Sequence, residues 1–407
     1  LIRTDWAGRK KWGSSHGARY MATDGARIYF ADDHGFDRSP DVRMLAVDDA
    51  RPVRLENGVA SFAAPPGAGT EASRVTGLAA QGGKLYVSYR ERDQIAVYDT
   101  ADGGLLTIWD VPAPGRLAVR PRGAVAVVGE NVVRSVRDGR VSDWLTSHLD
   151  EPQAVAVRAD GTAFVSCRGD LQTVSVFGAD GTFLRSIGAK GGRPAAGVYD
   201  PAGMFRPGGI TLDAKGRLWV AENADFPKRV SVWDARTGNL VDEFFGGASY
   251  FAYGTIDPAN PGEIYAHNVL WTIDWASYEV MPKTTIWRQT AANGVPAPNV
   301  DAYTGGGGFR LLTAADGRQF GWGGAPHHNV LVYRRDGALF RPLVGDFNPW
   351  RYDYDNLPVL DEVKTQLDAR WDRQGVPDHR RPRDLFWQES NGDGIVQADE
   401  LTVREGD

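Results

Sequence analysis

A unit of about 40–55 residues recurs along this chain of 407 residues and constrains the fold more than any other feature of the sequence. Each copy contains an apolar strand, a turn with Gly or Asp, a second apolar strand that ends in a small residue, a polar loop and a hairpin. The clearest copy spans residues 208–246, and two further copies span 75–110 and 153–188. Weaker copies begin near Arg19, Arg116, Tyr253 and Phe309.

Four short strands in each unit, repeated seven times, predict an all-β chain that folds as a β-propeller of seven four-stranded blades. The 49 Gly, 13 Trp, 14 Tyr and 16 Phe favour short strands with tight turns over long helices. A stacked β-solenoid is the alternative, but the units vary in length more than solenoid coils do. An eighth blade also stays open, built from residues 1–15 together with 384–404.

The segment "GGRPAAGVYDPAGMFRPGGITLDAKGRLWVAENADFPKRVSVWD" (191–234) resembles the NHL repeat, a family of propeller blades. The resemblance lies in its glycine-rich lead, its F-x-P step and its G-x-L-W-V-A strand. It implies a propeller, and it implies a possible role as an interaction platform, because NHL-type propellers often serve as one.

The repeat divides the chain into three parts. Residues 16–345 hold the seven units. Residues 1–15 look like the third and fourth strands of a blade that lacks its first two, so we expect them to close the last blade. Residues 346–407 form an extension packed on the propeller, in which 357–375 is predicted to be a helix. The helix begins near a proline, ends at a glycine and carries one apolar face, formed by Leu360, Val363, Leu367 and Trp371.

The stretch "ESNGDGIVQADE" (389–400) resembles the calcium loop of an EF-hand. Gly394 stands at the sixth position, where the loop turns sharply, and Val396 is the expected apolar residue at the eighth. Glu389 replaces the usual Asp at the first position. The expected ligands are Glu389, Asn391, Asp393, Ile395 through its carbonyl, Gln397 and Glu400.

Sensor EF-hands come in pairs with flanking helices, whereas this loop is single and follows a strand-like "RDLFW". We therefore expect a structural calcium ion that clips the extension in place. A surface turn that binds nothing is the alternative.

The net charge of −6 argues against a nucleic acid as the main partner, but it leaves open an acidic sugar held by a local arginine cluster. No apolar run approaches the roughly 18 residues needed to span a membrane. A single cysteine, Cys167, excludes an intramolecular disulfide. We expect a monomer that is bound neither to a membrane nor to nucleic acid. The first residue, Leu1, suggests a processed chain, and the excess of Arg over Lys suggests a bacterial source.

Candidate functional residues follow from aligning the ends of the second strands, since equivalent loops of different blades converge around the channel of a propeller. The fourth aligned position holds Asp32, Tyr89, Glu130, Cys167, Glu222, His267 and Gly323. The fifth position holds Asp33, Arg90, Asn131, Arg168, Asn223, Asn268 and Gly324. This rim is far more polar than the strands that lead into it.

Four of the seven histidines fall in this class of loop, and they belong to blades 6, 7 and 1, which are neighbours in a ring of seven; they are His34, His267, His327 and His328. His16 opens the first strand of blade 1, and Arg74, Arg206 and Arg310 stand at the starts of other first strands. The imidazoles predict either a site for a transition metal such as zinc, as a possible second metal, or a catalytic base. A third reading is that these polar side chains only tie neighbouring blades together.

In the catalytic reading, one histidine acts as base, Tyr89 as acid, and Arg90 or Arg168 pairs with a substrate carboxylate. Substrate contacts are expected from Arg74, Arg206, Arg310, Glu222, Asn223, Asn268 and Trp322. This set fits β-elimination from a uronic acid, in which the charge of the carboxylate must be neutralised. In its plan the rim is similar to propeller-fold polysaccharide lyases, which place His, Tyr and Arg in a cleft at the channel mouth.

The sequence thus favours a secreted carbohydrate-active enzyme, extracellular or periplasmic, that cleaves an acidic oligo- or polysaccharide as a lyase. A non-catalytic NHL-type binding or scaffold module is the main alternative. A glycoside hydrolase that uses Asp32, Asp33 or Glu222 is another, and an enzyme similar to the streptogramin lyases, which are propellers that eliminate across an ester, is a third.

Overall fold

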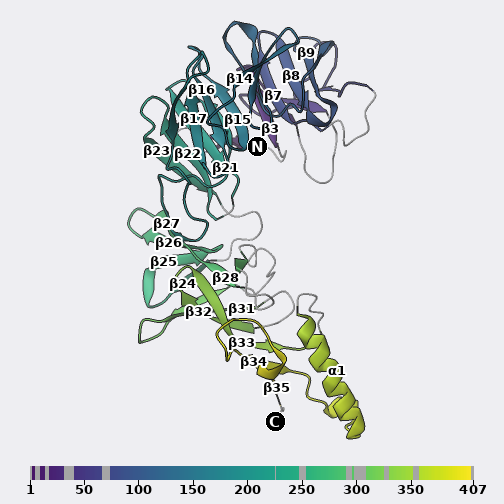
Figure 1. The fold of residues 1–407 in the computed structure, drawn as a ribbon, viewed down its shortest axis with the longest axis vertical. Helices are drawn as coiled ribbons and strands as arrows, with labels where there is room; N and C mark the ends of the chain where they lie inside the picture. The colour runs from purple at the N-terminus through teal and green to yellow at the C-terminus, as the bar shows by residue number, and fades with distance from the viewer. Residues whose placement is uncertain are drawn as a thin grey trace. The chain divides into compact units, whose positions relative to one another are not determined.

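The structure is a computed structural model, and it describes most of the chain (Figure 1). The described residues are 2–4, 10–13, 18–31, 41–66, 74–224, 226–246, 254–289, 296–297, 309–324, 330–351 and 357–404. These residues divide into two compact units, which are taken in turn.

Unit 1 consists of Leu1–Gly192, Ala202–Asn223 and Val230–Phe244. Its described residues form five four-stranded antiparallel sheets, each with its strands in sequence order. The strands are β3 (Tyr20–Thr23), β4 (Arg27–Ala31), β5 (Val42–Ala46) and β6 (Ser61–Phe62); β7 (Gly77–Gln81), β8 (Lys84–Tyr89), β9 (Gln94–Asp99) and β10 (Leu105–Asp110); β11 (Leu117–Val119), β12 (Val125–Val128), β13 (Val133–Arg137) and β14 (Arg140–Leu145); β15 (Pro152–Val157), β16 (Ala163–Cys167), β17 (Thr173–Phe177) and β18 (Phe183–Ile187); β20 (Pro207–Leu212), β21 (Arg217–Glu222), β22 (Lys228–Asp234) and β23 (Leu240–Gly246).

The five sheets of unit 1 pack on one another as the blades of a propeller do. Their first strands contact one another in the order β3, β7, β11, β15, β20. The apolar core of the described residues lies between consecutive sheets, where the alternate side chains of each strand meet those of the next sheet. Examples are Tyr29 with Leu85, Ile95 with Val125, Val128 with Val155, and Val174 with Leu218.

Buried serine hydroxyls at the ends of two second strands join the first strand of one sheet to that of the next. The Ser88 hydroxyl donates to the carbonyl of Gly115, just before β11, at 2.7 Å. The Ser166 hydroxyl donates to the carbonyl of Gly208 in β20 at 2.6 Å. Because Ser88 is also opposite Gly77 in the β7–β8 pair, the starts of neighbouring first strands lie at the same end of the unit.

Unit 2 consists of Arg193–Pro201, Ala224–Arg229 and Phe245–Asp407. It holds two further sets of four antiparallel strands, whose first strands, β24 and β30, contact each other. The sets are β24 (Gly254–Asp257), β25 (Asn260–Ala266), β26 (Val269–Asp274) and β27 (Glu279–Thr285), with β19 (Gly197–Val198) on β27; and β30 (Arg310–Thr313), β31 (Gln319–Gly324), β32 (Val330–Asp336) and β33 (Leu339–Phe347). All seven predicted units are therefore confirmed as sheets, and the all-β, blade-type fold with them.

The outer edge of the last sheet is extended by strands that the sequence did not assign to it. Strand β28 (Trp287–Gln289) runs parallel to β33 and pairs with β29 (Pro296–Ala297). Strand β34 (Leu385–Gln388) is antiparallel to β33 and pairs with β35 (Leu401–Val403). The predicted strand in "RDLFW" is thus confirmed, and the C-terminal extension continues a blade by hydrogen bonding as well as by packing.

The N-terminal strands β1 (Ile2–Thr4) and β2 (Lys10–Gly13) pair with each other and with no further strand among the described residues. The edge of β33 that they would need in order to complete the last blade already carries β28 and β34. Closure of a ring by residues 1–15 stays a prediction.

The predicted helix is confirmed as α1 (Pro358–Arg373), with a proline in its first turn. Leu360 and Trp371 are buried, and Val363 and Leu367 pack in the same cluster, which also contains Trp387 of β34. The apolar face thus covers the last sheet, as expected of an amphipathic helix.

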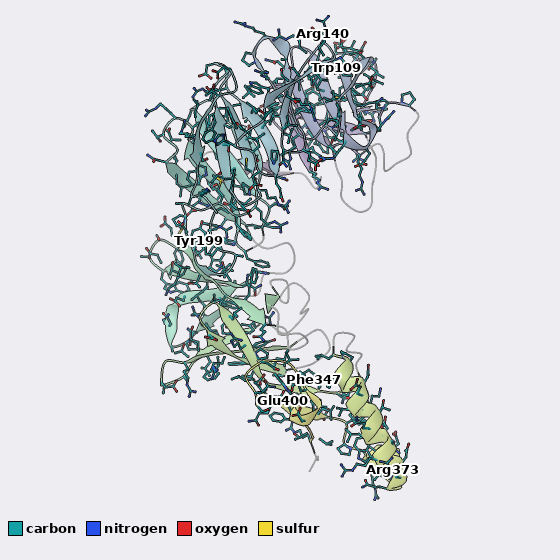
Figure 2. The ribbon with its side chains drawn as sticks, in the orientation of Figure 1. Trp109, Arg140, Tyr199, Phe347, Arg373 and Glu400 are labelled. Atoms are coloured by element: carbon teal, nitrogen blue, oxygen red, sulfur yellow. The ribbon has the colours of Figure 1, made fainter. Side chains whose placement is uncertain are left out.

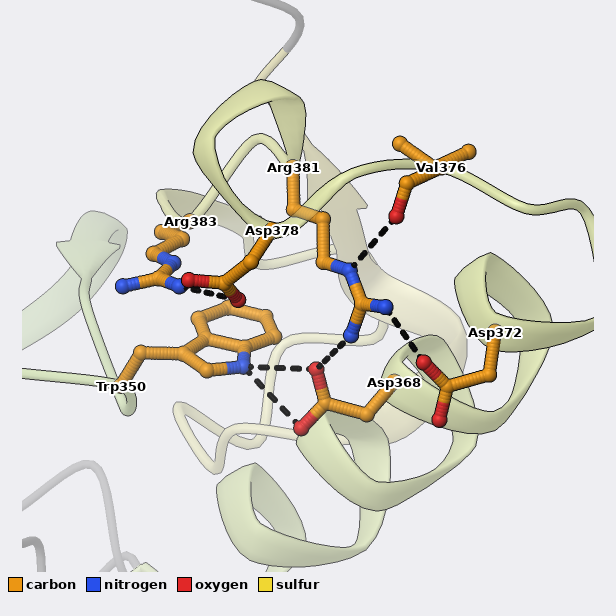
Figure 3. A network of polar contacts seen from close by, with 7 residues as sticks. All are labelled: Trp350, Asp368, Asp372, Val376, Asp378, Arg381 and Arg383. Atoms are coloured by element: carbon orange, nitrogen blue, oxygen red, sulfur yellow. Dashed lines mark hydrogen bonds and ion pairs between the residues drawn. The ribbon is translucent and has the colours of Figure 1, made fainter.

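A polar network fixes the end of this helix (Figure 3). The indole nitrogen of Trp350 donates to both carboxylate oxygens of Asp368, at 3.1 and 3.2 Å. The guanidinium of Arg381 forms ion pairs with Asp368 and Asp372 and donates to the carbonyl of Val376 at 3.1 Å. One arginine therefore ties the segment after α1 back onto its last turns.

Candidate functional site

The second strands end where the alignment predicted, in β4, β8, β12, β16, β21, β25 and β31. Of the histidines proposed for the rim, His267 is described, whereas His34, His327 and His328 lie outside the described residues. The convergence of four histidines, and the second metal ion proposed between them, therefore stay predictions. The remaining rim residues belong to two separate units.

Tyr89, proposed as a catalytic acid, has no exposed surface and belongs to the core between the first two sheets of unit 1. Burial is the main cause of a strongly raised pKa of its hydroxyl. An acid that touches a substrate needs an exposed oxygen, so this placement is at odds with the proposed role. The neighbouring Arg90 begins a short 3-10 helix and is exposed.

Gln172 connects two of the proposed rim arginines. Its side-chain nitrogen donates to the carbonyl of Arg168, and its side-chain oxygen accepts the backbone N–H of Arg206 at 2.5 Å. Arg206 has φ of 55°, a left-handed conformation that is uncommon for a residue with a side chain. The loops before β17 and β20 are thus held together, and Arg168 and Arg206 lie at one junction.

Glu222 and Asn223 lie at the same junction. A carboxylate oxygen of Glu222 accepts the backbone N–H of Phe205 at 3.1 Å, and the backbone N–H of Asn223 donates to the carbonyl of Arg206 at 2.9 Å. Glu222 is 9% exposed, whereas Arg206 and Asn223 are exposed. Glu222 therefore holds the loop, and the exposed arginine and asparagine side chains are the ones available to a ligand.

In unit 2, His267 and Asn268 form the turn between β25 and β26, with φ of 49° and 59°. Asn268 is fully buried; its side-chain oxygen accepts the Tyr265 hydroxyl at 3.2 Å, and its carbonyl accepts the Ile286 N–H at 2.7 Å. Asn268 is thus a structural residue of the turn, and its predicted contact with substrate has no exposed surface to support it.

Arg310 and Trp322, both predicted as substrate contacts, are neighbours. They lie directly opposite each other in the β30–β31 pair. Both side chains are exposed, and Trp322 retains 36% of its surface. An exposed indole beside a guanidinium offers a stacking face and a charge for a sugar acid.

The sequence alignment missed three residues at the start of the first strands of unit 1. The guanidinium of Arg116 lies 5.2 Å from the ring centre of Tyr20, and that of Arg19 lies 5.8 Å from it. Arg116 and Arg19 stand immediately before β11 and β3, as Arg74 and Arg206 stand before the first strands of their own sheets. This shared position before a first strand is the sequence signal that could have identified Arg19 and Arg116 as candidate site residues.

The residues of the proposed calcium loop form a compact hydrogen-bonded turn. Glu389 accepts the N–H groups of Asn391 and Gly392 at 2.9 and 2.6 Å, and also that of Gly394. Asp393 accepts the N–H of Ile395 at 2.7 Å and the side-chain N–H of Gln397 at 2.7 Å. The predicted ligands at the first, third and fifth positions, namely Glu389, Asn391 and Asp393, thus lie within one turn.

Glu400, labelled in Figure 2, is buried. Its oxygens accept the Trp387 indole N–H at 2.8 Å and the Ser390 N–H at 2.8 Å. Among the residues described, no three His, Cys, Asp or Glu side chains gather as a metal site would require. Oxygen donors of the kind calcium prefers are present, but the turn is also satisfied by its own amides, so calcium binding stays a prediction.

No protein-family model matches this chain, and no curated protein matches it. Among solved structures, selenomethionine-substituted virginiamycin B lyase from Staphylococcus aureus is 12% identical, with 77% of this chain and 93% of that chain covered at a TM-score of 0.42. A streptogramin B lyase is 12% identical over 75% and 90%, and hydrazine synthase from Kuenenia stuttgartiensis is 13% identical over 79% and 96%, both at a TM-score of 0.40. Similarity at this level carries no argument about the chemistry of this chain.

Within the described residues, no helix is long and apolar enough to cross a membrane.

Proposed function

We propose that this chain binds an acidic glycan at the end of unit 1 where the first strands begin, and that it cleaves a uronate-containing glycan by β-elimination. One observation carries the binding part: arginines stand just before the first strands of four of the five described sheets of unit 1, namely Arg19, Arg74, Arg116 and Arg206. Since those strands begin at one end of the unit, the four arginines stand at that end of the chain trace.

Arginine suits this task because its planar fork pairs with a carboxylate through two hydrogen bonds. In the elimination, the neutralised carboxylate makes the adjacent C5 proton more acidic and stabilises the anion that forms. A base takes that proton, the electron pair forms the C4–C5 double bond, and the glycosidic C4–O bond breaks. The leaving oxygen takes up a proton. Which group is the base stays the prediction of the sequence analysis, namely one of the histidines His34, His267, His327 and His328.

The test is to incubate the chain with uronate-containing polysaccharides and to follow ultraviolet absorbance. The unsaturated product absorbs where the saturated polymer does not. His267→Ala and His328→Ala are expected to abolish the signal while leaving the folded state intact. New reducing ends without an absorbance rise would instead point to hydrolysis, and full activity in every histidine variant would rule out the assigned base.

A binding module without catalysis is the second candidate, because exposed arginines stand at the rim of unit 1 whereas the proposed acid, Tyr89, is buried. Such a module would bind the same polysaccharides, release no product, and keep its affinity in the histidine variants.

We also propose that the loop 389–400 binds a calcium ion that fastens the C-terminal extension. In support, the side-chain nitrogen of Gln289 in β28 donates to the carbonyl of Asp393 at 2.6 Å, so the loop rests against the last sheet. A cation held by this loop would therefore stabilise the packing of the extension on the last sheet rather than act in catalysis.

A further inference from the structure

We infer that Arg116, with Tyr20 and Arg19 beside it, forms an oxyanion subsite among the first strands of unit 1 that takes the carboxylate of a sugar acid. The inference deepens the proposed function and rests on it for the identity of the sugar. Its binding step requires neither a catalytic base nor any residue of unit 2.

Arg116 reaches across the middle of unit 1. It starts from the third sheet, just before β11, and its guanidinium lies 5.2 Å from the centre of the Tyr20 ring in the first sheet. A Cβ atom built on Gly209, in the first strand of the fifth sheet, would come within 2.9 Å of its Nη1. The guanidinium thus lies among the first strands of three different sheets, where the channel of a propeller runs.

Gly209 matters because it leaves the room that this side chain occupies. An alanine there would place its Cβ against the guanidinium. The position of the Arg116 guanidinium therefore depends on a residue choice in another sheet, and a larger residue at Gly209 would push the guanidinium aside.

The electrostatic setting of Arg116 suits a negative ligand. Among the residues described, no carboxylate forms an ion pair with it, and the Tyr20 ring and the guanidinium of Arg19 lie nearby. Burial lowers the pKa of the Arg116 side chain; Tyr20 acts to raise it, and the nearby Arg19 charge lowers it. A partly buried cation beside a like charge destabilises the fold unless an anion joins it, because desolvation is not offset.

The ligand chemistry follows from the three side chains. The Arg116 guanidinium supplies the paired N–H donors that carboxylates and sulfates accept, the charge of Arg19 adds to the attraction, and the face of Tyr20 supplies an aromatic surface next to them. A sugar carboxylate uses both features, whereas inorganic sulfate uses only the donors. We therefore assign the site to the carboxylate of a uronic acid.

The experiment compares D-glucuronate with D-glucose, which differ in the carboxylate alone, by isothermal titration calorimetry at low ionic strength; sodium sulfate is a third probe. We expect the unaltered chain to bind glucuronate and not glucose. Arg116→Met should weaken glucuronate binding by about tenfold or more, since a charge-assisted pair is lost. Sulfate binding of equal strength would reduce the site to a general oxyanion site and overturn the assignment to a sugar acid.

Arg140→Met is the matched control, because Arg140 is exposed on an outer strand and its loss changes the net charge equally (Figure 2). It should leave glucuronate binding unchanged. Without ligand, Arg116→Met should melt at the same or a higher temperature than the unaltered chain, because an uncompensated charge has been removed. A lower melting temperature together with unchanged glucuronate binding would show a structural arginine and overturn the inference.

Failure of this inference and failure of the proposed function give different results. Glucuronate binding that depends on Arg116, without any unsaturated product from polysaccharides, would leave the subsite standing and remove the lyase. If Arg116→Met still formed the unsaturated product and bound glucuronate with unchanged affinity, the lyase proposal would stand and the Arg116 subsite would be ruled out.

Discussion

Two buried serines show how a single hydroxyl can fix the register between neighbouring sheets. Ser166 accepts the N–H of Ala154 in its own sheet at 3.1 Å and donates to Gly208 of the next sheet at 2.6 Å. Ser88 makes the corresponding bond to Gly115. Both side chains have no exposed surface, so water cannot replace either partner.

Ser166→Ala should lower the free energy of unfolding by about 1–2 kcal/mol, because it leaves the Gly208 carbonyl and the Ala154 N–H without that partner in a buried position. Ser88→Ala should have a similar effect. The two effects should add in the double variant, since the serines lie in different sheets and share no partner. Urea denaturation followed by fluorescence measures all three.

Ser142→Ala is the control for these variants. Its exposed hydroxyl donates to Ser135 at 3.3 Å, so water can take its place, and the expected change is less than about 0.5 kcal/mol. If all three single variants lost the same stability, the serines would not act as specific links between sheets.

For single residues, the sequence indicates the place in a strand better than the direction of the side chain. Aligning the second strands placed Tyr89 and Asn268 at strand ends; Tyr89 does end β8, whereas Asn268 lies in the turn after β25, and both side chains are buried. Strand alternation decides which face a residue occupies only while the strand stays regular, and Asn268 lies in a turn with positive φ. Arg116 was missed for the converse reason, because its importance comes from contacts with Tyr20 and Gly209, far away in sequence.

At the scale of elements, aspartates close the turns between first and second strands. Asp213 accepts the N–H groups of Lys215 and Arg217, both at 2.9 Å, and the indole N–H of Trp219 at 2.9 Å. Asp24 serves the equivalent turn of the first sheet and accepts the Tyr29 hydroxyl at 2.7 Å. Burial acts to raise the pKa of the Asp213 carboxyl, but the hydrogen bonds from Trp219 and Arg217 outweigh it and lower the pKa to about 2.

A carboxyl whose folded pKa lies below its unfolded value of 3.8 stabilises the fold fully above pH 3.8 and loses that contribution as the pH falls toward 2. Asp213→Asn should therefore unfold more easily than the unaltered chain at pH 7, by about 1–2 kcal/mol. The gap should close as the pH approaches 2. Denaturant unfolding across that range measures it, and Asp110→Asn, at an exposed position in β10, should show no such gap.

The calcium proposal is tested on the extension as an element. With calcium in excess over EGTA, the melting temperature should rise, because a ligand that binds only the folded state stabilises it. Glu389→Asp restores the usual first residue of the loop and should increase this rise, whereas Asp393→Ala should remove it. If calcium left the melting temperature of all three proteins unchanged, the proposal would be wrong. The loop would then be a turn that is held by its own backbone amide hydrogen bonds alone.

At the scale of the whole molecule, the sequence predicted the repeat completely. The strand pattern is local and recurs in every copy, so each copy predicts one four-stranded sheet. All seven predicted sheets are present. Pairings between distant segments were not visible in that way. Strand β28 joins β33 in parallel through only two registered pairs, and β34 returns to it after a helix, and no local pattern encodes either partner.

The charge distribution of the whole chain leads to the last prediction. The net charge is −6, yet arginines gather at the start of the first strands of unit 1, so a polyanion should be drawn to that end and repelled elsewhere. Binding of polygalacturonate should weaken as salt is added, because exposed charges are screened. The double variant Arg74→Met and Arg206→Met should weaken binding about fivefold to tenfold at low salt and flatten the salt dependence. A double variant at exposed arginines away from this end, Arg140→Met and Arg122→Met, changes the net charge equally, and an equal loss there would mean that the arginines of the rim have no special part in binding.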